Sequence, residues 1–264
     1  MTKIYYFSST GNSLWTARKV AQIIGEANSA EKCELYNIGI LAHNARENNS
    51  EIIIEADTAV IVFPSYAYSM PLIVRWFCRN AVFKTSYVAS LVTYGSSPLG
   101  TLGSLRKILK KKKIEKMFFA SIPAVENFLA MFGTPKPKKI KERTAMQERT
   151  TTEAAQAIIK RKENYVFGFY PFSLFISSLF ALGVKVLYKW YRVSDKCTGC
   201  AVCEKVCPVS AIKMKDNRPS FTPKCELCQG CVNLCPLRAI SFVRVKFGTE
   251  GYIHPEIKIS DLMR

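Results

Sequence analysis

Eight of the ten cysteines in this chain of 264 residues fall within one short segment near its C-terminal end. They form two groups, and each group reads C-x2-C-x2-C-x3-C-P. The first group is Cys197, Cys200, Cys203 and Cys207, and the second is Cys225, Cys228, Cys231 and Cys235. Three cysteines at this spacing let one loop present three thiolates to a [4Fe–4S] cubane, whereas zinc sites favour paired knuckles. Disulfides would need an oxidising compartment. The spacing therefore predicts iron–sulfur chemistry.

The second group repeats the first at an offset of 28 residues, including the proline after the fourth cysteine. That fourth cysteine lies past a helical turn, and in proteins with two clusters it binds the other cluster. We therefore expect cluster 1 on Cys197, Cys200, Cys203 and Cys235, and cluster 2 on Cys207, Cys225, Cys228 and Cys231. Over residues 193–246 the chain resembles bacterial-type two-cluster ferredoxins, which implies a small α+β domain.

The residues before the cysteines alternate between apolar runs and helical periodicity. Strands are expected at 3–7, 33–38, 58–64, 87–94 and 117–124, with helices at 14–24, 71–80 and 99–111. The uncharged run 58–64 is typical of a parallel strand buried on both faces. Strands that alternate with helices predict an α/β fold with a doubly wound, parallel, five-stranded sheet. Farther on, Thr150 and Glu153 form a capping-box pattern, which predicts a helix that starts there and runs through Ile159.

The loop after the first strand carries small hydroxyl residues and one glycine. It consists of Ser8, Ser9, Thr10, Gly11, Asn12 and Ser13. Such a loop can wrap a phosphate, to which the helix N-terminus adds amides and a positive dipole. The loop lacks the lysine of a Walker loop and the GxGxxG of a dinucleotide site. It therefore suits a bound monophosphate such as FMN. Taken alone, the same residues could be an ordinary helix cap.

Two more loops leave the same edge of the expected sheet, where open α/β sheets bind their ligands. Their candidate flavin-binding residues are Pro64, Ser65, Tyr66, Ala67 and Tyr68 in one loop, and Thr93, Tyr94, Gly95 and Ser96 in the other. We expect these loops to flank an isoalloxazine ring, with Tyr66, Tyr68 and Tyr94 as the aromatic candidates. The alternative for each tyrosine is ordinary packing.

These loops resemble the phosphate-binding and flavin-flanking loops of flavodoxins, and the whole chain resembles fused flavodoxin–ferredoxin proteins found in anaerobes. The family's P-x-Y-x4-P loop, its T-x-G loop and its later proline and asparagine match Pro64, Tyr66, Pro71, Thr93, Gly95, Pro123 and Asn127. The resemblance implies a flavodoxin-like FMN domain over 1–165 and an apolar connecting helix over 166–192. A two-cluster ferredoxin domain over 193–246 and a C-terminal tail over 247–264 would follow.

The connecting segment contains no charged residue between 166 and 184. A membrane span, a buried helix between the domains and a helix on a membrane surface are the alternatives. A span is disfavoured because Pro171 interrupts the start and because it would separate the flavin from the clusters by about 30 Å of apolar layer. A polar stripe through Ser173, Ser177, Ala181, Lys185 and Lys189 marks one helical face. We favour the helix between the domains and leave peripheral membrane contact through 166–192 open.

The formal net charge is +18, which favours acidic partners or anionic surfaces. The first residues do not form a secretory signal, so we expect a cytoplasmic protein, with membrane association as the open alternative. The basic run 106–113 is expected to be a solvated face. A docking patch for an acidic redox partner is expected at Lys136, Lys138, Lys139, Lys141 and Arg143. No nucleic-acid recognition motif is present.

The lone histidines His43 and His254 are expected to be structural or at the surface, and Cys33 and Cys78 are expected to be buried thiols. We expect an electron-transfer protein that passes electrons between two [4Fe–4S] clusters and FMN in anaerobic metabolism. Its partners would be acidic ferredoxin- or flavodoxin-type proteins or a reductase. The alternative is an FMN-dependent reductase of a small substrate. No catalytic residue is predicted, and the two functions differ in what covers the flavin.

Overall fold

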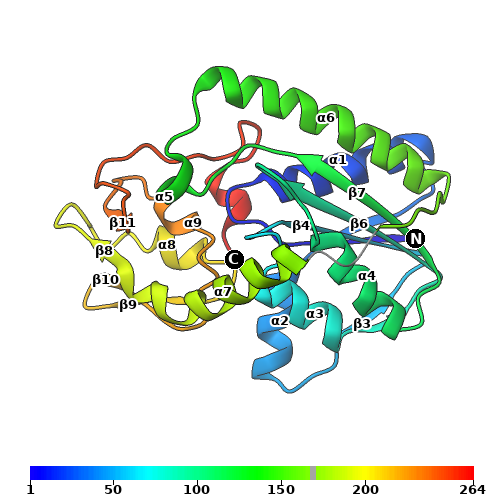
Figure 1. Cartoon of the computed structure of the whole chain (residues 1–264), viewed down its shortest axis with the longest axis horizontal. Coiled ribbons are helices and arrows are strands. Elements are labelled where there is room, and N and C mark those ends of the chain that lie inside the picture. Colours follow the sequence, from blue (N-terminus) through cyan, green and yellow to red (C-terminus); the bar gives the residue numbers. More distant parts are fainter. Residues whose placement is uncertain (167–170) are drawn as a thin grey trace.

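The computed structural model describes residues 1–166 and 171–264, and only the backbone of residues 171–174. Figure 1 shows a large α/β unit and a small unit that lies at one end of its sheet. The chain enters the sheet from the side opposite the small unit, so the carboxyl ends of the strands face the small unit. Ligands of open α/β sheets bind at this edge.

The large unit is built on a five-stranded sheet in which every neighbouring pair is parallel. The strand order is β2-β1-β4-β6-β7. The strands are β1 (Thr2–Tyr6), β2 (Cys33–Asn37), β4 (Thr58–Pro64), β6 (Tyr87–Tyr94) and β7 (Lys116–Pro123). Numbered in chain order, these five strands have the flavodoxin-like order 2-1-3-4-5. The order in which the chain adds strands to the sheet reverses between β1 and β4, although all the strands remain parallel. The expected flavodoxin-like sheet is confirmed.

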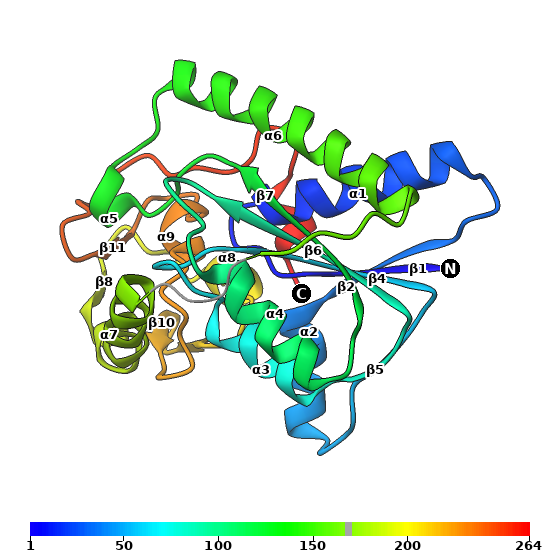
Figure 2. The same ribbon diagram turned by 45° about the vertical axis from the view of Figure 1, so that its right-hand side comes forward.

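Helices cover both faces of this sheet (Figure 2). One face packs against α1 (Asn12–Ala27) and α6 (Pro137–Ile159). The other face packs against α2 (Ile38–Glu47), α3 (Leu72–Asn80) and α4 (Thr101–Lys111). Successive side chains of β4 point to opposite faces of the sheet. Val60 packs in the core with α1 and α6, whereas Ile61 packs in the core with α2, α3 and α4. A two-stranded parallel pair, β3 (Ile53–Glu55) and β5 (Val82–Lys84), lies outside the main sheet.

Helix α6 is longer than its sequence pattern indicates. It begins at Pro137, in the first turn where proline is tolerated. Thr150 is therefore inside the helix, and its hydroxyl donates to the Met146 carbonyl at 2.9 Å. The predicted start at Thr150 is wrong, because threonine can satisfy its hydroxyl on the preceding turn as well as at a cap.

The small unit preserves the internal repeat as a pair of antiparallel ladders. Strand β8 (Tyr191–Val193) pairs with β11 (Ile240–Phe242), and β9 (Ile212–Lys215) pairs with β10 (Arg218–Phe221). The pairs Val193–Ile240 and Phe221–Ile212 are related by the offset of 28. Short helices α8 (Val202–Lys205) and α9 (Gly230–Asn233) are related in the same way. Each ladder joins one repeat to the other, so the two repeats depend on each other.

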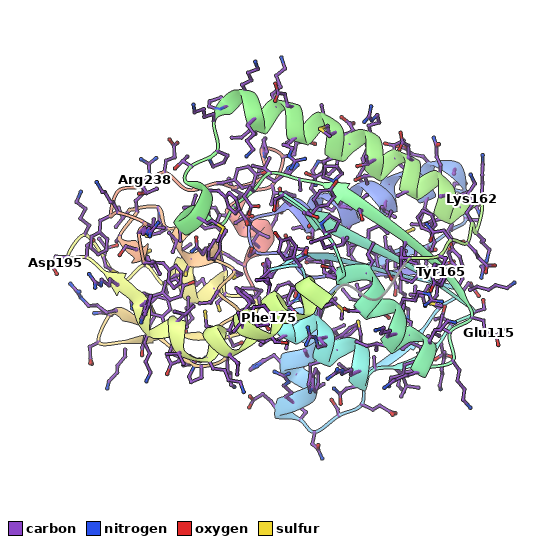
Figure 3. All side chains as sticks on the ribbon, viewed as in Figure 1. Glu115, Lys162, Tyr165, Phe175, Asp195 and Arg238 are labelled. Atoms are coloured by element: carbon purple, nitrogen blue, oxygen red, sulfur yellow. The ribbon has the colours of Figure 1, made fainter. Side chains whose placement is uncertain are left out.

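Helix α7 (Pro171–Leu187) and the 3-10 turn η1 (Tyr188–Trp190) connect the two units. Val184 of α7 is buried in the core that continues from the large unit into the small one. Figure 3 marks Phe175 on this helix and Asp195 and Arg238 at the outer end of the small unit. Among the described residues, no helix combines the length and apolarity needed to cross a membrane.

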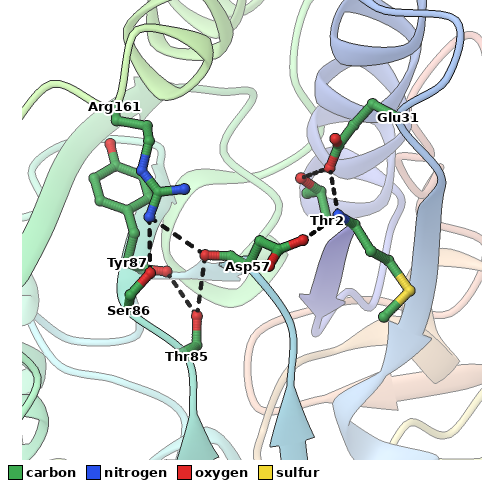
Figure 4. A network of polar contacts seen from close by, with 8 residues as sticks. Thr2, Glu31, Asp57, Thr85, Ser86, Tyr87 and Arg161 are labelled. Carbon is green, nitrogen blue, oxygen red and sulfur yellow. Dashed lines mark hydrogen bonds and ion pairs between the residues drawn. The ribbon is translucent and has the colours of Figure 1, made fainter.

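The opposite end of the sheet is tied together by polar contacts at the starts of β1, β4 and β6 (Figure 4). The amino group of Met1 pairs with Asp57, and the Thr2 hydroxyl donates to Glu31 at 2.9 Å. Arg161 donates to Ser86 at 2.9 Å. Most of these groups are near solvent, so each pair stabilises the fold only slightly. This network lies away from the edge that faces the small unit.

The two units meet closely at Gly39 in the first turn of α2. A β-carbon at this position would lie 1.9 Å from the carbonyl oxygen of Pro208, which follows the fourth cysteine of the first group. Gly39→Ala should therefore lower stability by about 1–3 kcal/mol through overpacking. A lower unfolding temperature and faster loss of iron–sulfur absorbance would show this effect.

Gly25→Ala is the matched control, because a β-carbon at this position in α1 meets nothing within 4 Å. It should stabilise the helix by roughly 0.5–1 kcal/mol. Equal unfolding temperatures for Gly39→Ala and the unmodified chain would contradict the close contact between the units.

Candidate iron–sulfur and flavin sites

The structure gathers the eight repeat cysteines into two quartets that exchange their fourth members. Cys197, Cys200, Cys203 and Cys235 line one small cavity. In addition to burial, Cys207 and Cys225 lie close enough to Cys228 and Cys231 to raise the pKa of both, so these four form the second set. This is the crossed arrangement that the repeat predicts, and we name the sets quartet 1 (Cys197, Cys200, Cys203, Cys235) and quartet 2 (Cys207, Cys225, Cys228, Cys231).

The backbone around the quartets repeats as well. The Ala211 amide donates to the Cys207 sulfur at 3.2 Å, and the Ala239 amide donates to Cys235 at 3.3 Å. Such donors favour the thiolate over the thiol. Positive φ angles recur at Gly199 (74°) and Leu227 (53°), and at Ala201 (59°) and Gln229 (55°). Each loop therefore curls around its sulfurs with the same backbone path.

Burial makes these sulfurs poor thiolates on their own. Burial, with a smaller contribution from neighbouring cysteines, raises the pKa of Cys203 and of Cys225 to about 11. It raises the pKa of Cys228 and Cys231 well above the usual range. Four thiolates can share such a place only with compensating positive charge, which an iron–sulfur core provides. The donor set therefore fits a cluster.

The geometry differs from that of a site for a single ion. Within the described part of the chain, no group of three His, Cys, Asp or Glu side chains is placed to bind a single metal ion. A cubane has another requirement, because each of its four irons takes one cysteine and the four sulfurs stand apart around it.

The quartets differ in their exposure to solvent. In quartet 1, Cys200 is exposed and Cys197 and Cys235 are partly exposed. In quartet 2, three of the four cysteines are buried, and only Cys228 is intermediate. Quartet 1 therefore lies at the surface of the small unit, whereas quartet 2 lies toward the large unit.

The loop Ser8–Ser13 follows β1 at the carboxyl edge and is buried along its whole length. Helix α1 starts at Asn12, with Gly11 at φ 101° in the cap position and no side chain capping the helix. The first amides of a helix have no partner within it. Thus the structure presents backbone donors at the end of α1 where the sequence predicts a phosphate site.

The second loop contains a tight hairpin from Tyr66 to Ser69, whose two amides and carbonyls bond each other at 2.9 Å. Its central residues, Ala67 and Tyr68, have φ angles of 45° and 62°. This conformation usually requires glycine or asparagine, so the hairpin is held by its surroundings. The Tyr66 hydroxyl lies 3.4 Å from the Ser9 hydroxyl, which brings the first two loops together.

The third loop joins the same assembly. The Thr93 and Ser13 hydroxyls are 2.8 Å apart, and Ser65 bonds Thr101 at the same distance. Gly95 lies against the side chain of Glu126, where a β-carbon would be 2.0 Å from a carboxylate oxygen. Asn127 donates to the Thr10 hydroxyl at 2.6 Å. The predicted loops, Asn127 and the unpredicted Glu126 therefore meet at one edge of the sheet.

The small unit covers this edge directly. The Ser9 hydroxyl donates to the Cys228 carbonyl at 3.4 Å, and a β-carbon on Gly230 would be 3.2 Å from the Ser9 carbonyl oxygen. Gln229 lies between Cys228 and Gly230 in the sequence. Its side chain is fully buried, and neither its nitrogen nor its oxygen has a hydrogen-bond partner among the described residues. An unpaired buried amide is costly. It fits a place that a polar cofactor completes.

Glu226, next to a quartet 2 cysteine, caps a helix of the other unit. Its carboxylate accepts from the amides of Leu72 (2.8 Å) and Ile73 (2.6 Å) at the start of α3. Burial raises the pKa of this carboxyl to about 7, although the two amides and two arginines oppose the rise. The capped helix therefore fixes the second cysteine loop against the large unit. No local sequence pattern indicates this role, because the donors are more than a hundred residues away.

The C-terminal tail, residues 247–264, packs against the Ser8–Ser13 loop on another side. His254 stacks on Trp15 of α1 with ring centroids 5.0 Å apart, and its amide donates to the Thr10 carbonyl at 2.9 Å. Tyr252 donates to the Asn12 side chain at 2.8 Å. The Nε2 atom of His254 is buried without a partner in the described chain, and burial lowers the pKa of His254 to about 4.

Comparison with known proteins gives a family match for the small unit and structural likenesses for the large unit. Residues 189–241 match the family model described as a 4Fe-4S dicluster domain. No curated protein matches the chain. The large unit is similar to solved structures that include a Streptococcus pneumonia TIGR4 flavodoxin, with 14% identity over 60% of this chain and 98% of that one, TM-score 0.37. A two-electron reduced Megasphaera elsdenii flavodoxin has 14% identity over 60% and 100%, TM-score 0.37. An azoreductase from Bacillus anthracis str. Sterne has 11% identity over 61% and 100%, TM-score 0.39.

The buried histidine predicts a pH dependence of stability. The pKa of His254 is lower in the folded chain (about 4) than its usual 6.5, so the unfolded chain binds more protons between these values. The contribution of His254 to stability should therefore fall as the pH drops from about 6.5 toward 4, by roughly 2 kcal/mol at pH 5. Glu226, whose pKa is raised to about 7, contributes in the opposite direction, so the comparison between variants isolates the share of His254. His254→Phe keeps the ring stacking and should reduce this loss, as measured by the unfolding temperature at pH 7.5 and 5.0. His43→Phe is the control, because His43 is partly exposed. An equal change in unfolding temperature between pH 7.5 and 5.0 in all three proteins would show that His254 does not cause the pH dependence.

Proposed function

We propose that this chain transfers electrons between two [4Fe–4S] clusters and FMN, and so links one-electron and two-electron partners in anaerobic metabolism. Each cluster would supply one-electron chemistry, whereas FMN supplies both one- and two-electron chemistry. The residues of the chain bind these groups, set their order and control their contact with water.

One observation carries this proposal. The loop that holds quartet 2 contacts the predicted phosphate loop through Ser9, which bonds the Cys228 carbonyl and lies against Gly230. Tyr66 of the second flavin loop also contacts Ser9. Two segments with separate predicted chemistries, more than 200 residues apart, therefore meet at a single residue.

The clusters are assigned to the crossed quartets. Cluster 1 would be held by quartet 1 and cluster 2 by quartet 2. Cys200 is exposed, whereas Cys225 and Cys231 are buried beside the large unit. This difference in exposure supports entry or exit of electrons at cluster 1. Cluster 2 would then lie between cluster 1 and the flavin.

The flavin site is assigned to the three loops. The first-turn amides of α1 and the loop Ser8–Ser13 would bind the phosphate. The residues Pro64–Tyr68 and Thr93–Ser96 would lie beside the ring. The unpaired amide of Gln229 would bond the cofactor from the small unit, which explains why a polar side chain is buried there.

The cover that the small unit forms over the phosphate loop supports an electron carrier. Ser9 and Thr10 are 3% and 1% exposed, and the small unit and the tail lie against them. The contact with the small unit would give an electron carrier a short path from the clusters, whereas the loops assigned to the ring are partly exposed. The partner would be an acidic redox protein. The exposed lysines Lys136, Lys138, Lys139 and Lys141 at the start of α6 offer one docking surface.

Iron analysis of paired variants tests the crossed quartets. The unmodified protein should contain about eight irons, and Cys200→Ala or Cys231→Ala about four. Cys207→Ala combined with Cys231→Ala should keep about four, because both cysteines serve cluster 2. Cys207→Ala combined with Cys200→Ala should keep almost none. The control Cys33→Ala should keep all eight.

The opposite result for the two double variants would show that each repeat holds its own cluster. About four irons in the unmodified protein would show that only one cluster is present.

A second experiment tests the flavin site at Gln229. Gln229→Leu removes the unpaired amide and should weaken FMN binding about five- to tenfold, the loss of one buried hydrogen bond. Quenching of flavin fluorescence during titration of flavin-free, cluster-loaded protein gives the affinity. Gln156→Leu, exposed on α6, is the control. Unchanged affinity with unchanged iron content would remove Gln229 from the site, and no binding by the unmodified protein would refute the flavin.

A further inference from the structure

Helix α7 exposes an apolar stripe that the fold leaves uncovered. Phe175, Leu179, Leu182 and Val186 are 62%, 51%, 65% and 56% exposed. They follow one another at intervals of four, three and four residues, so they lie on one face of the helix. The opposite face, at Val184, is 1% exposed and belongs to the shared core. The helix is therefore apolar on two faces, and only one of them is covered.

The stripe differs from the face expected from the sequence. The predicted polar stripe places Ser177 and Ala181 on the same side as the lysines, but both residues are only partly exposed. The side open to solvent combines the four apolar residues with Lys185 and Lys189 along one border. Contiguous exposed apolar surface of this kind marks an interaction site.

The charges on the connecting segment itself are all positive. Residues 164–194 contain no Asp or Glu. Lys185, Lys189 and Arg192 are exposed, and neither lysine forms an ion pair with any described residue. Trp190 ends the connecting segment and is 52% exposed. Tryptophan beside lysine at the border of an apolar face is typical of groups at a membrane surface.

We propose that α7 docks this stripe on an anionic lipid surface, with Phe175, Leu179, Leu182 and Val186 in the acyl boundary and Lys185 and Lys189 at the headgroups. The helix would lie in the plane of the membrane. A second copy of the chain fits less well, because it would bring like charges together next to the stripe, within a chain of net charge +18. This surface does not depend on which cofactors the chain binds.

The test is flotation of the full-length, cluster-loaded protein with vesicles. Binding is expected to vesicles of phosphatidylcholine with 30% phosphatidylglycerol, to be much weaker to phosphatidylcholine alone, and to fall with added salt. On binding, the emission of Trp190 should shift to shorter wavelength, and Trp190→Phe identifies its share of the signal.

Two double variants separate the contributions. Leu179→Gln with Leu182→Gln should reduce binding at least tenfold, and Lys185→Gln with Lys189→Gln roughly 10- to 30-fold, at about 1 kcal/mol for each lysine. Met131→Gln is the matched control, because Met131 is 72% exposed on another helix, α5 (Leu129–Phe132). It should bind as the unmodified protein does. Unchanged iron–sulfur absorbance shows that each variant is folded.

Three results would overturn the proposal. The first is absence of binding to anionic vesicles. The second is equal binding by the leucine variant and the unmodified protein. The third is a dimer, seen by size-exclusion chromatography, that dissociates in the leucine variant, because the stripe would then be an interface between copies. If the first result comes with capture of an acidic protein, the stripe is a docking surface for a protein partner.

Discussion

The arrangement of the whole molecule depends on the close approach of two backbone segments, the Ser8–Ser13 loop and the turn from Cys228 to Gly230. The approach favours a residue without a side chain at Gly230, because a β-carbon there would stand 3.2 Å from the Ser9 carbonyl oxygen, a tighter contact than most β-carbons make. Because this turn belongs to quartet 2, the contact orients the small unit with one quartet inward and Cys200 of the other at the surface. The order of the proposed cofactors follows from this single contact.

Other interactions hold the approach in place from three sides. Glu226 caps α3, Asn233 donates to the Asn127 carbonyl at 3.1 Å, and the tail bonds Thr10 through His254. The apolar core is also continuous between the units. These contacts fix the distance between the two sites, which an electron carrier needs more than it needs catalytic side chains. The unpaired amide of Gln229 is a costly feature at the contact, and a bound cofactor would relieve it.

The features that the sequence predicts correctly are those that depend on local spacing. The cysteine repeat indicates which cysteines come together in space, because all eight lie within two short loops. The apolar run of β4 and the loops after β1, β4 and β6 indicate the sheet and its functional edge, since parallel strands end on the same side. Asn127 is also correctly placed, through a family resemblance rather than a pattern in the chain.

The features that the sequence misses arise where distant segments meet. Glu226 caps amides of the other unit, and Glu126 and Gln229 lie beside loops far from them in the chain, so no periodicity indicates any of the three. His254 is correctly expected to be structural, but its stacking on Trp15 is not foreseen. The start of α6 is missed because Thr150 fits both a cap and a helix interior.

The central claim is that electrons pass between the clusters and the flavin within one chain. Stopped-flow mixing of the anaerobic, fully loaded protein with a reduced one-electron donor measures this directly. The clusters should bleach first, at a rate that rises with donor concentration, and flavin absorbance should then fall at a rate that is independent of protein concentration. A flavin rate proportional to protein concentration, or flavin that stays oxidised while the clusters are reduced, would contradict the account.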